Sequence, residues 1–240
     1  GTGMGTVMFG GRGKLRGAGL GDVNGEGQLD LLERDGAALD VRSWTPNSLG
    51  WPADGCGWLR QSFYAGSGPS PTDSTGSWGG SHMFATDLDG DGDADVVSAD
   101  EAHHDGLSWY EQTLPGTFAR HRIMGGPNEL ASFGVYFSQL HALEVADMDG
   151  DGVSDIITGK TYLAQALGYG DSDPQGKPVV YVFRTVREPR LDGSPVSFEP
   201  ILIDEESGVG YQLAVGHLDR DGILDLCIAS KLGLYVFLGQ

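Results

Sequence analysis

The chain has 240 residues, of which 39% are hydrophobic, so it can bury the core of one sizeable domain or two small ones. Its formal net charge of -19 excludes a surface for nucleic acid or anionic lipid and favours bound cations. No apolar run approaches the length of a membrane helix, so we expect no membrane span.

The first ten residues, GTGMGTVMFG, lack the charged start and apolar core of a signal peptide, and they do not begin with Met. We therefore expect a chain that was processed or cut from a longer precursor. Glycine is abundant, with 40 residues, and much of it lies at turns between short β-rich runs. This composition favours an all-β protein of many short strands.

Four similar loops recur along the chain, at 22–30, 87–95, 147–155 and 217–225. Each has oxygen-bearing side chains at positions one, three and five, Gly at position six and Asp at position nine, except that His217 begins the fourth loop. The loops start 60 to 70 residues apart, which indicates a repeat architecture.

The sequence between the loops predicts four strands in each repeat. Apolar runs precede three of the loops (HMFAT, HALEVA and YQLAVG), and another run, such as DVVSA or DIITG, follows each loop directly. A third run comes later (ALDVRSW, GLSWYEQ, VVYVFRTV and GLYVFLG), and a fourth follows where there is room (LRQSFYA, FARHRIM and VSFEPILI). Four strands make one propeller blade, so we predict an all-β β-propeller of four-stranded blades with Asp-rich Ca²⁺-binding loops. Residues 1–240 are expected to form a single propeller domain or a portion of a propeller.

The two ends of the repeat array leave two architectures open. After the fourth loop two strands remain, DLCIAS and GLYVFLG, whereas the N-terminal GTVMFG is a strand without a blade. Pairing GTVMFG with the last blade would close a four-bladed ring; alternatively, other sequence or another subunit completes a larger propeller. A bridge between Cys56 and Cys227 is possible in a closed ring, although the apolar run around Cys227 favours a buried thiol.

The loops are expected to bind Ca²⁺, which takes about six to eight oxygen ligands, because Gly permits the turn that points alternate side chains at one centre. Without a cation the clustered carboxylates would repel one another. Loops two and three have a complete set of four Asp ligands. Loop one has a longer acid at position five, and loop four begins with an imidazole, which is a poor Ca²⁺ ligand. We therefore expect two to four bound ions. Such sites fill outside cells, which favours an extracellular or cell-surface protein. The predicted ligands are Asp22, Asn24, Glu26 and Asp30; Asp87, Asp89, Asp91 and Asp95; Asp147, Asp149, Asp151 and Asp155; and Asp219, Asp221 and Asp225.

A second group of polar residues is predicted near one mouth of the central channel. His82, His141 and Tyr211 start the strands that lead into three of the loops, and the innermost strands line the channel. His103, His104, Lys160 and Tyr162 follow second strands. Such a cluster could bind a sugar acid, abstract a proton or hold a transition metal; alternatively, these polar residues line a wet channel and cap strands.

Three tryptophans, Trp51, Trp58 and Trp78, lie in or beside the loop-rich stretch 45–81, which is rich in Gly, Pro, Ser and Thr. Loops carry function more often than strands, so these residues are candidates for a ligand or partner surface.

The four loops and their following strands resemble the FG-GAP/VCBS repeats of integrin-type β-propellers. SADEAHHDGLSWYEQ, SQLHALEVADMDGDGVSDIITGK and IDEESGVGYQLAVGHLDRDG are similar to sequences of bacterial secreted VCBS-repeat proteins. The resemblance implies a propeller with Ca²⁺ in its blade loops. It extends to adhesion modules, lectins and domains attached to polysaccharide-degrading enzymes.

Three functions remain open from the sequence. The first is an extracellular Ca²⁺-binding module that recognises a glycan or another protein. The second is a carbohydrate-active, lyase-like enzyme that uses the His/Lys/Tyr mouth. The third is a self-assembling subunit of an extracellular fibre or oligomer. The sequence has no nucleophile elbow, no HExxH motif and no phosphate loop, so we assign no catalytic residue.

Overall fold

The computed structural model describes residues 18–25, 27, 29–35, 38–44, 58–64, 82–99, 106–125, 134–163, 171–188 and 194–240. These residues form fifteen β-strands and no α-helix, so the described part of the chain holds no helix that could cross a membrane. The prediction of an all-β fold is confirmed.

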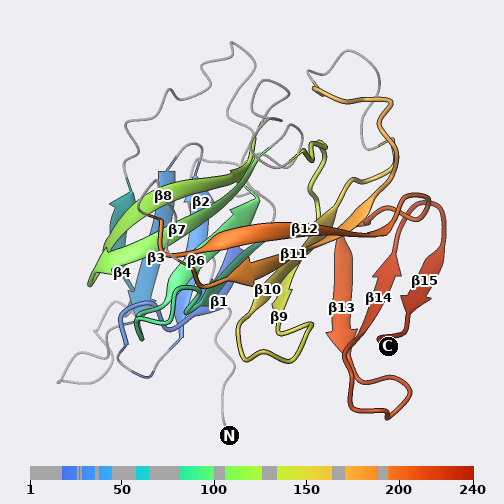
Figure 1. Ribbon diagram of the computed structural model, residues 1–240. Coiled ribbons are helices and arrows are strands. Elements are labelled where there is room, and N and C mark those ends of the chain that lie inside the picture. The colour runs from blue at the N-terminus through green and yellow to red at the C-terminus, as the bar shows by residue number, and fades with distance from the viewer. Residues whose placement is uncertain are drawn as a thin grey trace, which may run out of the picture.

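The strands form four antiparallel sheets, each of which follows the order of the chain (Figure 1). The first three sheets have four strands, as predicted for a propeller blade, and the fourth has three. The first sheet contains β1 (Ala18–Gly21), β2 (Asp30–Asp35), β3 (Ala38–Trp44) and β4 (Trp58–Tyr64). The second contains β5 (Met83–Thr86), β6 (Asp95–Ala99), β7 (Leu107–Leu114) and β8 (Thr117–Met124). The third contains β9 (Leu143–Ala146), β10 (Asp155–Gly159), β11 (Val180–Val186) and β12 (Ser197–Asp204), and the fourth contains β13 (Gln212–Gly216), β14 (Asp225–Ala229) and β15 (Leu234–Phe237).

Neighbouring sheets pack face to face, and their first strands are neighbours in the order β1, β5, β9 and β13. Successive side chains of a strand point to opposite faces, so each second strand contributes to two cores. Val96 joins the apolar cluster between the first and second sheets, whereas Val97 joins the cluster between the second and third. A third cluster, which includes Ile157 and Leu226, fills the space between the third and fourth sheets.

Strand β1 leads into the first loop without an apolar run, since its sequence is AGLG. The neighbouring strand β5 explains its glycines. A Cβ atom at Gly19 would lie 2.1 Å from the carbonyl oxygen of Met83, and one at Gly21 would lie 2.1 Å from the Cβ atom of Ala85. The first strand therefore uses glycine so that it can approach the second sheet closely.

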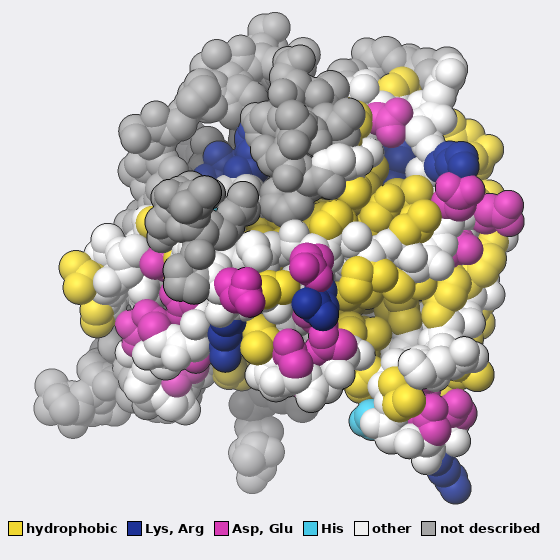
Figure 2. Space-filling model, viewed as in Figure 1, with side chains coloured by type: hydrophobic (Ala, Val, Ile, Leu, Met, Phe, Trp, Pro, Cys, Tyr) yellow, Lys and Arg dark blue, Asp and Glu magenta, His cyan; other side chains and the backbone are white. Residues whose placement is uncertain are grey.

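The outward face of the fourth sheet has no sheet packed on it among the described residues. In the third sheet, Ile157 pairs with Val182, and both are buried against the fourth sheet. The equivalent pair in the fourth sheet is Cys227 and Val236, which point away from the third sheet. Val236 is 51% exposed and Cys227 is a free, half-buried thiol. Figure 2 shows hydrophobic side chains gathered on the side of the molecule where β12 and the fourth sheet lie.

The described residues form no closed ring, since the first and fourth sheets are not paired with each other. The predicted N-terminal strand and Cys56 lie outside the described residues, so closure through GTVMFG stays a prediction. Three strands begin later than expected: β5 begins at Met83, β9 at Leu143 and β13 at Gln212. His82, His141 and Tyr211 therefore precede their strands.

Candidate functional site

Each Asp-rich loop joins the first strand of a sheet to the second, and in loops two and three the first Asp organises the turn. The two carboxylate oxygens of Asp87 accept hydrogen bonds from the amides of Gly90, at 2.6 Å, and Gly92, at 3.2 Å. Asp147 accepts equivalent bonds from Gly150 and Gly152, at 2.8 and 2.9 Å. These four glycines have positive φ angles of 78° to 96°, which explains why the sequence needs glycine there.

The acidic side chains of these two loops converge. Carboxylate oxygens of Asp87, Asp89 and Asp95 lie within 4.8 Å of one another, and so do those of Asp147, Asp149 and Asp151. Burial is the main reason that the pKa of Asp89 is raised, and the negative charges of neighbouring acids add to the effect. Three carboxylates around one point fit a hard divalent cation such as Ca²⁺, which would offset their repulsion.

Position nine of the loop has a second, structural role that the sequence pattern did not reveal. Asp95 is 1% exposed; one of its oxygens accepts a hydrogen bond from the amide of Leu88 and the other from the amide of Gln112 in β7. Asp155 is held in the same way by the amides of Met148 and Thr185. Burial raises the pKa of both carboxyl groups to about 6, against the opposing effect of these hydrogen bonds. The ninth residue thus ties the loop to the third strand of its sheet.

Loops one and four differ from this arrangement. In loop one, Asp22 accepts a hydrogen bond from the amide of Gly27 at 2.6 Å, and the buried Asp30 accepts one from the amide of Val23 at 3.0 Å. Asn24 is exposed, and Glu26 lies outside the described residues.

In loop four, His217 holds the turn with its ring, since its Nδ1 atom lies 2.9 Å from the carbonyl oxygen of Ile223. Asp219 and Asp221 each accept a hydrogen bond from an amide two residues further on, and Asp225 bonds to the amides of Leu218 and Gly239. Among the described residues, clusters of three acids occur in loops two and three and not in loop four.

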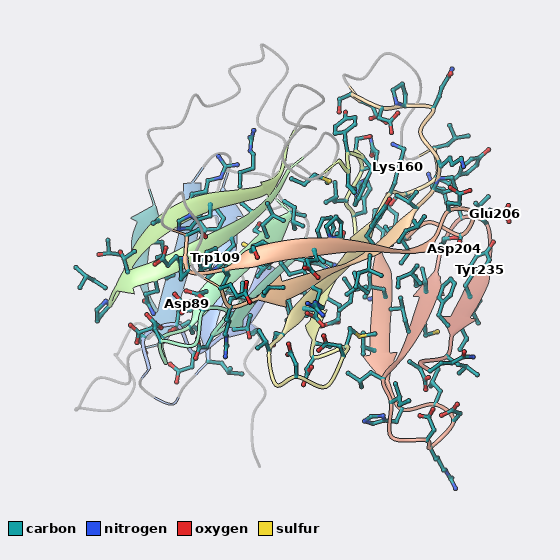
Figure 3. The ribbon with its side chains drawn as sticks, in the orientation of Figure 1. Asp89, Trp109, Lys160, Asp204, Glu206 and Tyr235 are labelled. Atoms are coloured by element: carbon teal, nitrogen blue, oxygen red, sulfur yellow. The ribbon has the colours of Figure 1, made fainter. Side chains whose placement is uncertain are left out.

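The strand directions place the predicted channel-mouth residues at the opposite end of the sheets from the loops. Figure 3 shows this separation between Asp89 and Lys160. The His141 ring packs edge-on against the ring of Tyr211, with centroids 5.0 Å apart. The Nδ1 atom of His82 lies 3.2 Å from the carbonyl oxygen of Leu143, so this histidine links the second and third sheets.

Of the other candidates, the structure describes Tyr162 and the backbone of Trp58. Tyr162 follows β10 and is 38% exposed. Trp58 lies in β4, but its side chain is not among those that the structure describes. His103, His104, Trp51 and Trp78 lie outside the described residues.

Lys160 is 2% exposed and lies in a polar cluster whose other members the sequence did not single out. Its ammonium donates a hydrogen bond to the Ser138 hydroxyl at 2.7 Å and lies 4.0 Å from carboxylate oxygens of both Asp171 and Asp173. Burial lowers the pKa of Lys160, and the two carboxylates oppose that change. Burial alone would raise the pKa of Asp171, but the hydrogen bond from Ser138, the amide of Asp173 and the charge of Lys160 bring it below its ordinary value. The positive charge of Lys160 is therefore offset by the carboxylates of Asp171 and Asp173 within the cluster.

Comparison with protein families identifies the repeat. Residues 87–158 match the model of the FG-GAP-like repeat, and this span includes loops two and three and all of the sequence between them. The chain therefore contains an FG-GAP-like repeat, as its Asp-rich loops predicted. The search of curated proteins found no match.

Among solved structures, the chain is similar to a lectin of Agrocybe aegerita, described as specifically recognising non-reducing terminal N-acetylglucosamine. The TM-score is 0.53 and the sequence identity 15%, and the similarity covers 93% of this chain and 49% of the lectin chain. The chain thus spans about half the length of that lectin chain. At this identity the likeness concerns the fold alone.

Proposed function

We propose that this chain is an extracellular, calcium-binding module of the β-propeller type that binds a glycan. The observation that carries the proposal is the recurrence of a three-carboxylate cluster in the Asp-rich loop of two successive repeats, with the acids of positions one and three in both. Residues 1–240 would then act as one propeller domain or a portion of one. The lectin fold favours a glycan over a protein as the ligand.

Calcium would act on stability in this proposal. In loop two Asp87, Asp89 and Asp95 would hold the ion, with Asp91 beside them, and in loop three Asp147, Asp149 and Asp151 would hold it, with Asp155 beside them. The ion would neutralise the acids and fix the turn between the first two strands of each sheet. A ligand that binds the folded state alone stabilises that state by mass action. Millimolar Ca²⁺ outside cells would keep such loops filled.

The proposal is tested by measuring metal content, thermal unfolding and glycan binding on the same preparation. We expect at least two Ca²⁺ ions per chain, a lower Tm in EDTA that Ca²⁺ restores, and binding to at least one glycan on an array. An unchanged melting curve in EDTA would overturn the calcium part, and an array without any bound glycan would overturn the recognition part.

The outward face of the fourth sheet supports a second candidate, self-assembly with a second copy of the chain. Leu20 is 60% exposed and pairs with Leu31 on the outward side of the first sheet. Packing this pair of one copy against Cys227 and Val236 of another would reproduce the contact between neighbouring sheets. Such head-to-tail contacts generate rings or filaments.

Sedimentation velocity tests this candidate. We expect association that increases with protein concentration and is lost in Val236→Lys. The control is Leu114→Lys, at a 64% exposed position of the second sheet, which should leave association unchanged. A monomer at all concentrations would contradict self-assembly.

A further inference from the structure

A groove of about 370 Å³ lies at the end of the third sheet opposite the Asp-rich loops. The segment that precedes β9 and the segment that precedes β11 form its walls, and β11 itself contributes Tyr181. Its main side chains are those of Tyr136, Phe137, Asp173, Lys177 and Tyr181. Binding sites in proteins commonly combine such an aromatic wall with a few fixed polar groups.

Buried aromatic rings hold the aromatic wall of the groove in place. Phe137, which is 2% exposed, stacks on the ring of Tyr181, with centroids 5.5 Å apart and planes 13° apart. Phe137 also contacts Phe183, which is fully buried. This stacking fixes the orientation of the Tyr181 ring. Tyr181 is only half-buried and lines the groove. A fixed aromatic ring offers an apolar face for the C–H face of a sugar ring.

The polar side of the groove is equally constrained. Asp173 lines the groove, and its carboxylate lies 4.0 Å from the buried ammonium of Lys160. The turn that follows brings the Asp173 carboxylate against Gly176, where a Cβ atom would lie 1.7 Å from a carboxylate oxygen. Glycine at 176 is therefore required for this position of Asp173. The carboxylate is placed to accept hydrogen bonds from ligand hydroxyl groups.

The charges around the groove decide which class of sugar fits. Lys160 is shared between Asp171 and Asp173, and Lys177 is 2.7 Å from a carboxylate oxygen of Glu205. Each lysine is thus already paired with an acid, and the three acids outnumber the two lysines. Among the described residues around the groove, a ligand carboxylate would meet more acids than lysines, and each of these lysines already has an acid partner. Like charges at short range repel.

We propose that this groove binds an uncharged pyranose, with Tyr181 against the ring and Asp173 accepting from its hydroxyl groups. The inference rests on the proposed glycan-binding function and names its site and its sugar class. Sugar acids are not expected to bind in this groove.

Titration calorimetry with Ca²⁺-loaded protein tests the assignment, with the methyl glycosides of N-acetylglucosamine and glucuronic acid as probes. We expect the neutral sugar to bind and glucuronic acid to bind at least about tenfold more weakly. Asp173→Asn keeps the size of the side chain and removes its charge, and it should weaken binding of the neutral sugar about tenfold. Tyr181→Ala should abolish detectable binding.

The matched control is Tyr235→Ala, which removes a half-buried tyrosine from β15 of the fourth sheet that does not line the groove. It should leave affinity unchanged, and circular dichroism should show that both groove variants remain folded. If the Tyr181→Ala variant does not fold, the affinity of Asp173→Asn for the neutral sugar alone tests the groove.

Neutral-sugar binding that both groove variants retain would overturn the groove while leaving the glycan-binding function intact. Preferred binding of glucuronic acid would overturn the sugar class. A glycan array on which the wild-type chain binds nothing would overturn the proposed function and this inference together.

Discussion

Asp95 accepts a hydrogen bond from the main-chain amide of Gln112 over 2.9 Å, although the two residues are 17 positions apart. The bond crosses from the end of the Asp-rich loop to β7, the third strand of the same sheet. Gln112 in turn donates from its side chain to the carbonyl oxygen of Val23 at 3.0 Å. One acid therefore connects its own loop, its own sheet and, through Gln112, the first loop of the chain.

This role predicts that the ninth position differs from the others when calcium is absent. Asp155→Ala leaves the part-buried amide of Met148 and the buried amide of Thr185 without their acceptor, which should cost about 2–4 kcal/mol with or without Ca²⁺. Asp149→Ala should destabilise the protein in Ca²⁺ and have little effect in EDTA. Urea unfolding of both variants under both conditions provides the measurement. Equal losses for the two variants in EDTA would show that position nine is not structural.

The loops are also expected to differ in calcium binding. Asp89→Ala and Asp149→Ala should each remove one bound ion, because each breaks a three-carboxylate cluster. Asp219→Ala should leave the Ca²⁺ content unchanged, since His217 begins loop four and bonds to a carbonyl oxygen. Metal analysis after dialysis against dilute Ca²⁺ gives the stoichiometry. Loss of an ion in Asp219→Ala would mean that loop four binds calcium.

Gly159 is predicted to be intolerant of a side chain. A Cβ atom there would lie 2.1 Å from the carbonyl oxygen of Val179, which accepts a hydrogen bond from the amide of Lys160. Gly159→Ala should therefore destabilise the protein by about 1–3 kcal/mol, by the cost of overpacking. Gly216→Ala is the control, because its Cβ atom would meet nothing within 4 Å. Melting curves that shift equally in the two variants would contradict the steric explanation.

Glu144 is predicted to make stability depend on pH. Burial raises its pKa above the ordinary 4.5, despite the hydrogen bond from the amide of Val145 and the nearby His82. The folded state therefore binds this proton more tightly than the unfolded state, and its contribution to stability falls as the pH rises through the window above 4.5. Glu144→Gln removes the buried charge and should raise the Tm at pH 7.

The measurement is calorimetry in EDTA at pH 7 and pH 4.5, so that metal binding does not change between conditions. The advantage of Glu144→Gln should shrink at the lower pH, where the wild-type carboxyl group is protonated in a larger fraction of folded molecules. An advantage that grows on acidification would contradict the raised pKa.

The sequence predicted the parts of the fold that depend on local chemistry. Asp and Gly at fixed spacing define the loops, and the apolar runs around them define most of the strands. No apolar pattern marks strand β1, because Gly19 and Gly21 are selected by contact with β5, about 65 residues away, and not by strand propensity. Local pattern carries no signal for a residue whose type is set by a distant neighbour.

The same distinction applies to the sites. The converging acids of loops two and three follow from spacing within nine residues. The partners of Lys160 do not, because Ser138 precedes it by 22 positions and Asp171 belongs to the connection before β11. Their meeting depends on how β9, β10 and β11 align in the third sheet.

The outward pair Cys227 and Val236 has a consequence for how such proteins gain length. The boundary between the second and third sheets and that between the third and fourth sheets use the same two positions of the second and third strands, Val97 with Trp109 and Ile157 with Val182. The contact surface is therefore reproduced whenever the repeat is duplicated. An additional repeat at the end of the chain could pack its sheet on the outward face of the fourth sheet, which already has compatible residues. The unit of evolutionary change, and of protein engineering, is then a whole sheet with its loop, and a grafted sheet could bring its own ion and its own groove.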